Sequence, residues 1–450
     1  MQDIKHITTK HTGRFRRIIP LGRKQHAPRN AFRRPAPETP ERRRRLKVLL
    51  PLLACLIAAY PLFHLLVSAK NAISSVSARS VRPTALRGEL DFAQSFRLAN
   101  ESLPSAKLDG ERLLAPLQDG TTVVYAINPE LQARVKAVMA EYRVPYGVFV
   151  AVEPKSGRIL ALAAHSEKDS AWQAQAPYNL YPMASLFKII TASAALEQRK
   201  VTPQTVLPFR GGLTSENPRY WSVGNRRGNQ EMSLTMAMGK SVNPLFGRLA
   251  GDVVGKEGIM QGMERFGFNQ LLFPGTPITP CSSVTPQDDG ELKRMGAGLC
   301  RDVKISPFYA ALMMAAIANK GMMLQPMLAD EIRGSKGKIL FSDQAKPVRR
   351  VVSPETADQL ATMMSTTVSQ GTSRKVFRDR RGRPKLAAVD IAAKTGSING
   401  TDPPGHYSWF AAYAPIDDPQ IALAALIVNG EKWRIKASLL GEQALEAFFK

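Results

Sequence analysis

Apolar residues follow helical spacing in some stretches and form strand-like runs in others, and a continuous globular pattern begins near residue 121. Residues 129–142 have helical spacing. Two apolar runs follow at 146–152 and 158–164, separated by turn-forming residues at 153–157. The pattern therefore predicts a helix followed by a β-hairpin.

The rest of this region predicts helices first and strands afterwards. Helical patterns occur at 185–199 and 305–319, with a mostly helical region rich in Gly and Met between them. Strands are predicted at 386–393, 409–414 and 421–428, with turns at 402–405 and 417–419, and an amphipathic helix follows at 437–449. Because strand patterns flank the helical ones, the predicted fold class is α+β: an antiparallel sheet flanked by helices, with an all-helical subdomain.

The first 67 residues differ from this domain. Residues 48–67 are twenty residues without a charge, which as a helix would span roughly 30 Å, the thickness of the hydrocarbon core of a bilayer. The basic residues before them predict an N-terminus in the cytoplasm and an exported domain. A cleavable signal peptide is the alternative, but both the leader and the apolar run are long for one. The prediction is one uncleaved N-terminal transmembrane helix.

The charge of the chain is concentrated in that tail. The net charge is +25, and residues 1–47 contribute +12 of it through fifteen Lys or Arg and three acidic residues. The remainder is spread out, without the basic stripe interleaved with aromatic residues that nucleic-acid binding requires. We therefore exclude a nucleic-acid partner.

Residues 68–120 have no firm period and are expected to form a linker or a small stalk. The predicted organisation is a basic, disordered cytoplasmic tail at 1–47, an anchor at 48–67, the linker at 68–120 and one domain at 121–450. Cys281 and Cys300 lie in the exported part, where either a disulfide or two separate thiols would fit. No Cys/His cluster indicates a metal, and no cofactor is expected.

Ser185 and Lys188 form a Ser-x-x-Lys pattern at the start of a predicted helix. Residues three apart share a helix face, so the lysine amine can lie beside the hydroxyl. A serine nucleophile needs such a base, and a lysine can serve only when its pKa is lowered. Ser335 and Lys338 match the same pattern, but Gly337 and the strand-like residues after it predict a hairpin turn there.

Two further motifs follow Ser185 in the chain. Ser241 and Asn243 form Ser-x-Asn, and Pro244 favours a turn between helices that would point both polar side chains sideways. Lys394-Thr395-Gly396, extended by Ser397, ends the apolar run 386–393, which places it on a strand where the glycine lets a ligand approach. Ser-x-Asn also occurs at 215–217 and 397–399, so each motif is weak by itself.

The order of the three motifs is the informative feature. Because the motifs occur in this order, the chain resembles the penicillin-binding protein transpeptidase family, in its monofunctional, class B-like form. This family belongs to the superfamily of serine D,D-transpeptidases and β-lactamases. The resemblance covers about residues 121–450. It extends to further stretches, at 128–132, 148–164, 305–321, 371–372 and 409–415.

The resemblance implies a role for each motif residue. Ser185 would attack the carbonyl of a D-Ala-D-Ala stem peptide and Lys188 would accept its proton. Ser241 would relay a proton, and Lys394 would support Ser241 electrostatically. Asn243 would hold the substrate amide. The remaining residues would bind the substrate: Thr395, Gly396 and Ser397. The backbone N–H groups of Ser185 and Ser397 would form the oxyanion hole. Ser397 replaces the threonine usual in the family, and residues 70–120 are too few for the family's usual pedestal domain.

The function implied is that of a peptidoglycan D,D-transpeptidase that also binds penicillin, in the bacterial cytoplasmic membrane with its catalytic domain outside. The expected partners are peptidoglycan stem peptides, β-lactams as inhibitors and cell-wall synthesis proteins. A D,D-carboxypeptidase, which uses water as acceptor, is the main alternative. A β-lactamase and a non-catalytic β-lactam sensor also share the motifs. The sequence leaves open the acceptor, the stem-peptide variant and whether the enzyme serves elongation or division.

Overall fold

The computed structural model describes residues 89–224, 228–342 and 344–450. The predicted basic tail, the predicted anchor and residues 68–88 of the predicted linker lie outside these described residues. Within the described residues, no helix combines the length and the apolar character needed to cross a bilayer.

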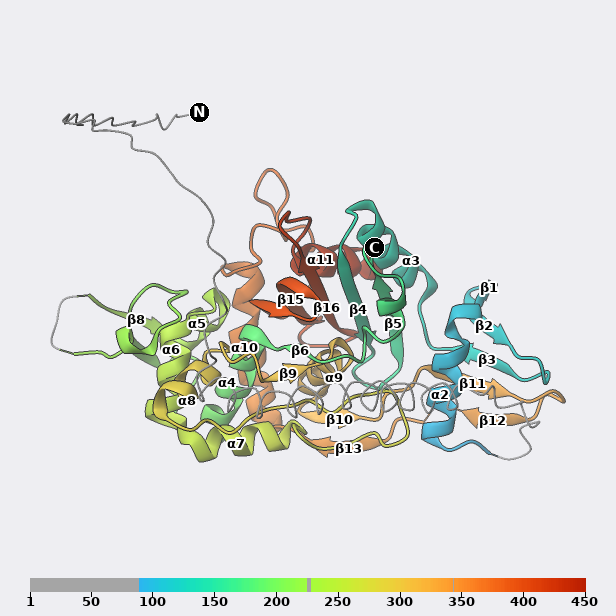
Figure 1. Cartoon of the computed structure of the whole chain (residues 1–450), viewed down its shortest axis with the longest axis horizontal. Coiled ribbons are helices and arrows are strands. Elements are labelled where there is room, and N and C mark those ends of the chain that lie inside the picture. Colours follow the sequence, from blue (N-terminus) through green and yellow to red (C-terminus); the bar gives the residue numbers. More distant parts are fainter. Residues whose placement is uncertain (1–88, 225–227, 343) are drawn as a thin grey trace, which may run out of the picture. The chain divides into compact units, whose positions relative to one another are not determined.

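The main sheet has five antiparallel strands in the order β14-β15-β16-β4-β5 (Figure 1). Their bounds are Ala392–Thr401 for β14, Pro404–Ala414 for β15, Ile421–Asn429 for β16, Tyr146–Val152 for β4 and Ile159–His165 for β5. The predicted hairpin at 146–164 is confirmed as β4 and β5. Because β4 pairs with β16, the two ends of the domain meet in the middle of the sheet.

Helices cover both faces of this sheet. Helix α9 (Pro307–Ala318) packs on one face, and α3 (Pro129–Glu141) with α11 (Ala437–Phe449) on the other. Alternate residues of a strand point to opposite faces, so Val150 belongs to the core under α9 and Phe149 to the core under α3 and α11. The predicted helices at 129–142, 305–319 and 437–449 and the α+β class are confirmed.

Short polar caps explain where two of these helices begin. Asn128 accepts a hydrogen bond from the N–H of Leu131 before α3, and Ser306 accepts one from Tyr309 before α9. A proline in the first turn follows each cap, where its missing N–H is not needed.

The predicted strand at 386–393 is wrong in its bounds. Residues 386–391 form turns and irregular backbone, and β14 begins at Ala392. The extent of β14 is set by its pairing with β15. The two strands run in unbroken register, from Ala392 opposite Tyr413 to Thr401 opposite Pro404. Leu386 and Val389 are apolar because they pack against the core under α3 and α11.

A mostly helical subdomain is inserted between β5 and β14. The expectation that it would be all-helical was wrong, because a pair of antiparallel strands at 206–210 and 229–233 lies between two of its helices. Its helices are α4 (Phe187–Glu197), α5 (Leu234–Lys240), α6 (Asn243–Arg248), α7 (Gly255–Arg265), α8 (Asp289–Gly296) and α10 (Pro354–Ser369). Short strand pairs accompany it: β6 (Tyr181–Pro182) with β9 (Lys304–Ile305), β7 (Val206–Arg210) with β8 (Asn229–Ser233), and β10 (Met322–Leu324) with β13 (Pro347–Arg350).

The described part of the predicted linker is folded. It forms α2 (Phe92–Ser102), β1 (Lys107–Asp109) and β2 (Arg112–Pro116), and these strands join β3 (Thr122–Tyr125), β11 (Ala329–Arg333) and β12 (Ile339–Ser342) in a second five-stranded sheet (Figure 1). The expected domain start at residue 121 therefore falls between two paired strands, β2 and β3. Cys281 and Cys300 are both free thiols.

Candidate active site

Ser185 lies in a single 3-10 turn, Ala184–Leu186, that leads into α4, in agreement with its predicted place at a helix start. Residues ahead of the turn are held by long-range hydrogen bonds: Met183 N donates to Val303 O at 2.9 Å, and Trp409 Nε1 donates to Pro182 O at 2.9 Å. The main sheet thus positions the serine.

The backbone around Ser185 is tightly packed. Ala184 has φ of 52°, in the left-handed region. Two glycines approach it. A Cβ on Gly298 would lie 2.3 Å from the Ala184 carbonyl oxygen, and one on Gly396 would lie 3.1 Å from the Ala184 Cβ. A side chain at position 396 of the third motif would therefore crowd β14 against the serine turn.

Lys188 is fully buried, and its amine has three partners. Its Nζ lies 2.7 Å from Ser185 Oγ, 2.8 Å from Asn243 Oδ1 and 2.7 Å from the carbonyl oxygen of Ala297. Burial, and then the nearby charge of Lys394, hold the pKa of Lys188 well below its ordinary value. A neutral amine would donate its two N–H groups to Asn243 and Ala297, which leaves its lone pair for the Ser185 proton.

The second motif lies between α5 and α6, where a turn was expected. Ser241 has φ of 57° and Val242 is extended. The turn ends before Asn243 and does not include it as expected, because α6 begins at Asn243 and Pro244 takes a first-turn position. Asn243 is buried, and its backbone N–H donates to Leu213 O at 2.8 Å. Its side chain is thereby held toward Lys188.

The third motif lies inside β14 and not at the end of a strand. Lys394 is fully buried, and its Nζ donates to Ser241 Oγ at 2.9 Å and to Thr395 O at 2.8 Å. Burial lowers the pKa of Lys394 to about 7. Thr395 Oγ1 lies 2.6 Å from Thr372 Oγ1, so a residue just after α10 shares this site.

A cleft of about 760 Å³ opens over these residues. Ser185, Ser241, Asn243, Thr372, Thr395, Gly396 and Ser397 line it, together with other residues. The two buried lysines lie beneath this lining. The structure thus brings together every predicted site residue, from segments more than a hundred and fifty residues apart.

The other sequence matches lie elsewhere or serve the fold. Ser335 and Lys338 are in the turn between β11 and β12 of the second sheet. Ser215 Oγ accepts a hydrogen bond from Trp221 Nε1 at 2.9 Å. Sequence reasoning missed Ala297, whose contribution is a backbone carbonyl that leaves no signal in the residue type. Among the described residues, no group of three or more His, Cys, Asp or Glu could hold a metal.

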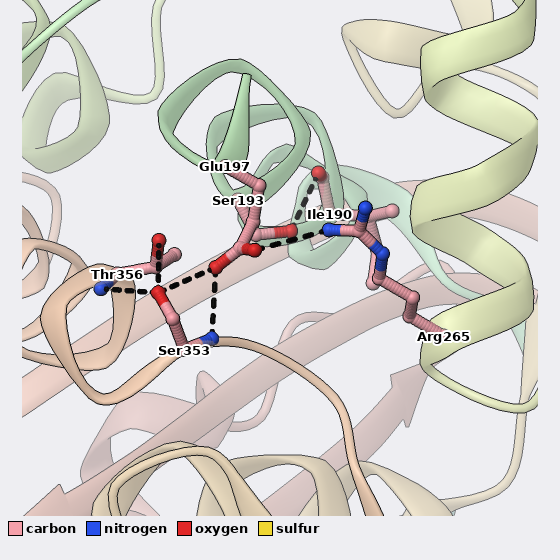
Figure 2. A network of polar contacts seen from close by, with 6 residues as sticks. All are labelled: Ile190, Ser193, Glu197, Arg265, Ser353 and Thr356. Atoms are coloured by element: carbon pink, nitrogen blue, oxygen red, sulfur yellow. Dashed lines mark hydrogen bonds and ion pairs between the residues drawn. The ribbon is translucent and has the colours of Figure 1, made fainter. Parts of the chain in front are cut away.

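Glu197 anchors the far end of α4 (Figure 2). Its Oε1 accepts hydrogen bonds at 2.8 Å from both the N–H and the Oγ of Ser353, and its Oε2 pairs with Arg265 Nη1 at 3.2 Å. Burial raises the pKa of the Glu197 carboxyl, but the hydrogen bonds from Thr356 and Ser353 and the Arg265 charge outweigh it, so the net pKa is lowered. Ser353 caps α10, the helix that leads to Thr372.

The comparisons with known proteins agree with this arrangement. The family described as "Penicillin binding protein transpeptidase domain" matches residues 147–444, a span that contains all three motifs. The chain belongs to the penicillin-binding protein transpeptidase family. The predicted family, and the prediction of an enzyme of the serine acyltransferase type, are therefore confirmed.

Relatives and solved structures extend the match. The chain is 31% identical over 320 residues to the peptidoglycan D,D-transpeptidase PbpA of Mycolicibacterium smegmatis, which covers 63% of this chain and 62% of that protein. It is 30% identical over 348 residues to the PbpA of Mycobacterium tuberculosis, with 69% and 68% covered. The chain thus spans about two thirds of the length of these relatives.

Among solved structures, penicillin-binding protein A of Mycobacterium tuberculosis has a TM-score of 0.59 and 27% identity, covering 73% of this chain and 80% of that one. Its imipenem acyl-enzyme complex has a TM-score of 0.60 and 25% identity, with 73% and 79% covered.

Proposed function

We propose that this chain is a peptidoglycan D,D-transpeptidase that works through an acyl-enzyme on Ser185. The observation that carries the proposal is the Lys188 amine, fully buried and 2.7 Å from Ser185 Oγ. Burial gives the lysine the lowered pKa that a base for serine requires. The names of the relatives, and the acyl-enzyme complexes of the structural neighbours, support the same chemistry.

In the first half-reaction, Ser185 Oγ attacks the carbonyl carbon of the D-Ala-D-Ala bond and its proton passes to Lys188. The resulting oxyanion accepts hydrogen bonds from the backbone N–H groups of Ser185 and Ser397. The leaving nitrogen then takes a proton by way of Ser241, which Lys394 contacts at 2.9 Å. The C–N bond breaks, D-alanine leaves and an ester on Ser185 remains.

In the second half-reaction, an amine of a neighbouring stem peptide attacks this ester. The bond between the carbonyl carbon and Ser185 Oγ breaks, Ser185 takes up the proton that the attacking amine loses, and the new amide is the cross-link. In the first half-reaction, before D-alanine leaves, Thr395 and Ser397 bind the terminal carboxylate of the donor peptide, with Thr372 contacting Thr395 at 2.6 Å. Gly396 keeps β14 close to Ser185. A β-lactam acylates the same serine through its ring carbonyl.

We also propose that residues 48–67 anchor the enzyme in the bacterial cytoplasmic membrane, with the basic tail in the cytoplasm and the described domain outside. The support is the uncharged run and the basic residues before it. Cell-wall synthesis proteins are the proposed partners there. The second sheet, whose strands β1, β2 and β3 precede the residues matched by the transpeptidase family, adds a further surface to the exported domain.

The deciding experiment incubates the enzyme with a synthetic D-Ala-D-Ala stem peptide and an amine acceptor, and separates the cross-linked from the trimmed product. We expect cross-linked product together with one D-alanine released for each transfer. Trimmed product alone would mean a D,D-carboxypeptidase. In parallel, a penicillin acyl-enzyme should last minutes, whereas hydrolysis within seconds would mean a β-lactamase.

A further inference from the structure

The segment between α10 and β14 carries a concentrated positive charge. Residues 374–385 contain seven Lys or Arg and one acidic residue, Asp379. This segment, which we call the basic hairpin, follows α10 in the chain (orange in Figure 1). None of the catalytic motifs accounts for it.

The basic hairpin has a defined structure. Phe377 is buried and its ring lies 5.7 Å from that of Phe410 in β15, which fixes the base of the hairpin to the main sheet. An antiparallel bridge joins Arg378 to Pro384. The carboxylate of Asp379 accepts hydrogen bonds at 2.9 Å from the backbone N–H groups of Arg381 and Arg383. The charges are thus presented on an ordered turn.

Most of this charge is not neutralised locally. Arg383 pairs with Asp379 at 2.8 Å, and Lys385 pairs with the buried Glu442 at 3.1 Å. Four exposed cations have no carboxylate within ion-pair distance in the described part of the chain: Arg374, Lys375, Arg380 and Arg381. An anionic partner would therefore meet free positive charge here.

The hairpin also adjoins the active site. It starts two residues after Thr372, which lines the cleft and contacts Thr395 of the third motif. The charged residues that line the cleft are balanced, with three cations and three anions: Lys240, Arg294, Arg301, Glu216, Glu291 and Asp302. The cleft wall thus carries no net charge from these six residues, and the excess of cations lies in the hairpin that follows Thr372 in the chain.

We infer that the basic hairpin is a docking surface for the substrate polymer, through the carboxylates of several stem peptides along an uncross-linked strand. The inference rests on the proposed function, because only that function brings a multiply carboxylated strand to this edge of the cleft. Fixed charges beside a site raise the rate of encounter with oppositely charged partners by 10-fold or more, and salt screens the effect. A small monoanion such as penicillin gains much less than a polyanion.

The test compares two four-residue variants of the full-length enzyme. In the first, Arg374, Lys375, Arg380 and Arg381 are changed to Gln. In the second, a matched control, four exposed cations of the second sheet and its helix are changed to Gln: Arg97, Lys107, Lys336 and Lys338. D-alanine release from uncross-linked peptidoglycan strands is measured at low and high salt, beside the rate of acylation by a fluorescent penicillin.

We expect the hairpin variant to lose about ten-fold in kcat/KM on the strands at low salt, a loss that shrinks at high salt. Its penicillin acylation should stay near that of the wild type. So should its turnover of strands whose carboxylates, other than that of the terminal D-alanine, have been amidated. Unchanged kcat/KM, or an equal loss in the control variant, would overturn the inference. The inference would also be overturned if the hairpin variant lost binding to vesicles of anionic phospholipid while its turnover of strands stayed intact. Absence of both penicillin labelling and D-alanine release in the wild type would instead refute the proposed function.

Discussion

Two segments of this chain have the same pattern, serine followed three residues later by lysine, and they have opposite environments. Ser185 and Lys188 lie at the start of α4, where every residue from Phe187 to Leu196 is buried. Ser335 and Lys338 lie in the turn between β11 and β12, and both are exposed. There the backbone reverses direction, with Gly334 N donating to Lys338 O at 2.8 Å.

The difference shows that the environment, and not the residue pair, makes a nucleophile. The side chain of Lys338 is exposed to water. Lys188 has exchanged water for two oxygen acceptors and the hydroxyl of Ser185, at the distances given above. Removing the charged form from water favours the neutral amine, and only the neutral amine can accept the serine proton.

The largest contrast should come from the serines. Ser185→Ala removes the attacking oxygen, so fluorescent penicillin labelling and D-alanine release should both be abolished. Ser335→Ala should leave both within about two-fold of the wild type, because surface substitutions seldom disturb a distant site. Gel fluorescence after a fixed labelling time measures this. Persistent labelling of Ser185→Ala would remove Ser185 as the nucleophile.

The two lysines should differ nearly as much. Lys188→Ala removes the base and should slow acylation by about a thousand-fold, within the range known for general bases. Lys338→Ala should have no measurable effect. Stopped-flow or quenched acylation kinetics would give both rates. Similar losses in the two variants would mean that burial does not distinguish the two segments.

A third experiment changes the electrostatic environment of Lys188 without touching it. The charge of Lys394 helps to lower the pKa of Lys188. Lys394→Met removes that charge, so the pKa of Lys188 should rise and the neutral amine should form only at higher pH. The acidic limb of the acylation pH profile should therefore move to more alkaline pH, with a smaller loss of rate than in Lys188→Ala.

Lys394→Arg is the matched control for this shift, because it keeps the positive charge. Its acidic limb should lie near that of the wild type even if its maximal rate falls. A limb that moves to lower pH in Lys394→Met, or that moves equally in both variants, would contradict the electrostatic account.

The smallest expected effect concerns the contacts of Glu197 at the far end of α4. Glu197→Gln loses charged hydrogen bonds to Ser353 and Arg265 and should cost about 1–2 kcal/mol of the free energy of unfolding, measured with urea at pH 7. Asp358→Asn, in the exposed pair with Lys320 on the same α10, should cost less than about 0.5 kcal/mol.

The pH dependence of that difference follows from the sign of the shift. The folded pKa of Glu197 lies below its ordinary value of 4.5, so the stabilisation is present above that value and is lost as pH falls through the folded pKa. Wild type and Glu197→Gln should therefore converge in stability in acid. A difference that stays constant as the pH falls from 7 until the wild type itself unfolds would contradict the role of the charge.

Much of the fold could be predicted because its signals are local. The helices at 129–142 and 437–449 have apolar faces at helical spacing, and the hairpin at 146–164 has two apolar runs around a turn. The second sheet could not be predicted, because β3 pairs with β11 across about two hundred residues and neither strand is long. The start of β14 was misplaced for the same reason, since its pairing with β15 decides the strand and its own apolar residues do not.

The order of the three motifs was readable along the chain, and it was enough to predict the family and the nucleophile. The contacts that make these residues reactive could not be predicted from the sequence. Asn243 and Ala297 reach Lys188 from 55 and 109 residues away, and Lys394 reaches Ser241 from 153 residues away. Residue types name the groups that can react, because side-chain chemistry is local. Burial and contacts across the fold decide which lysine becomes a base, because a pKa depends on everything that replaces water around the charge.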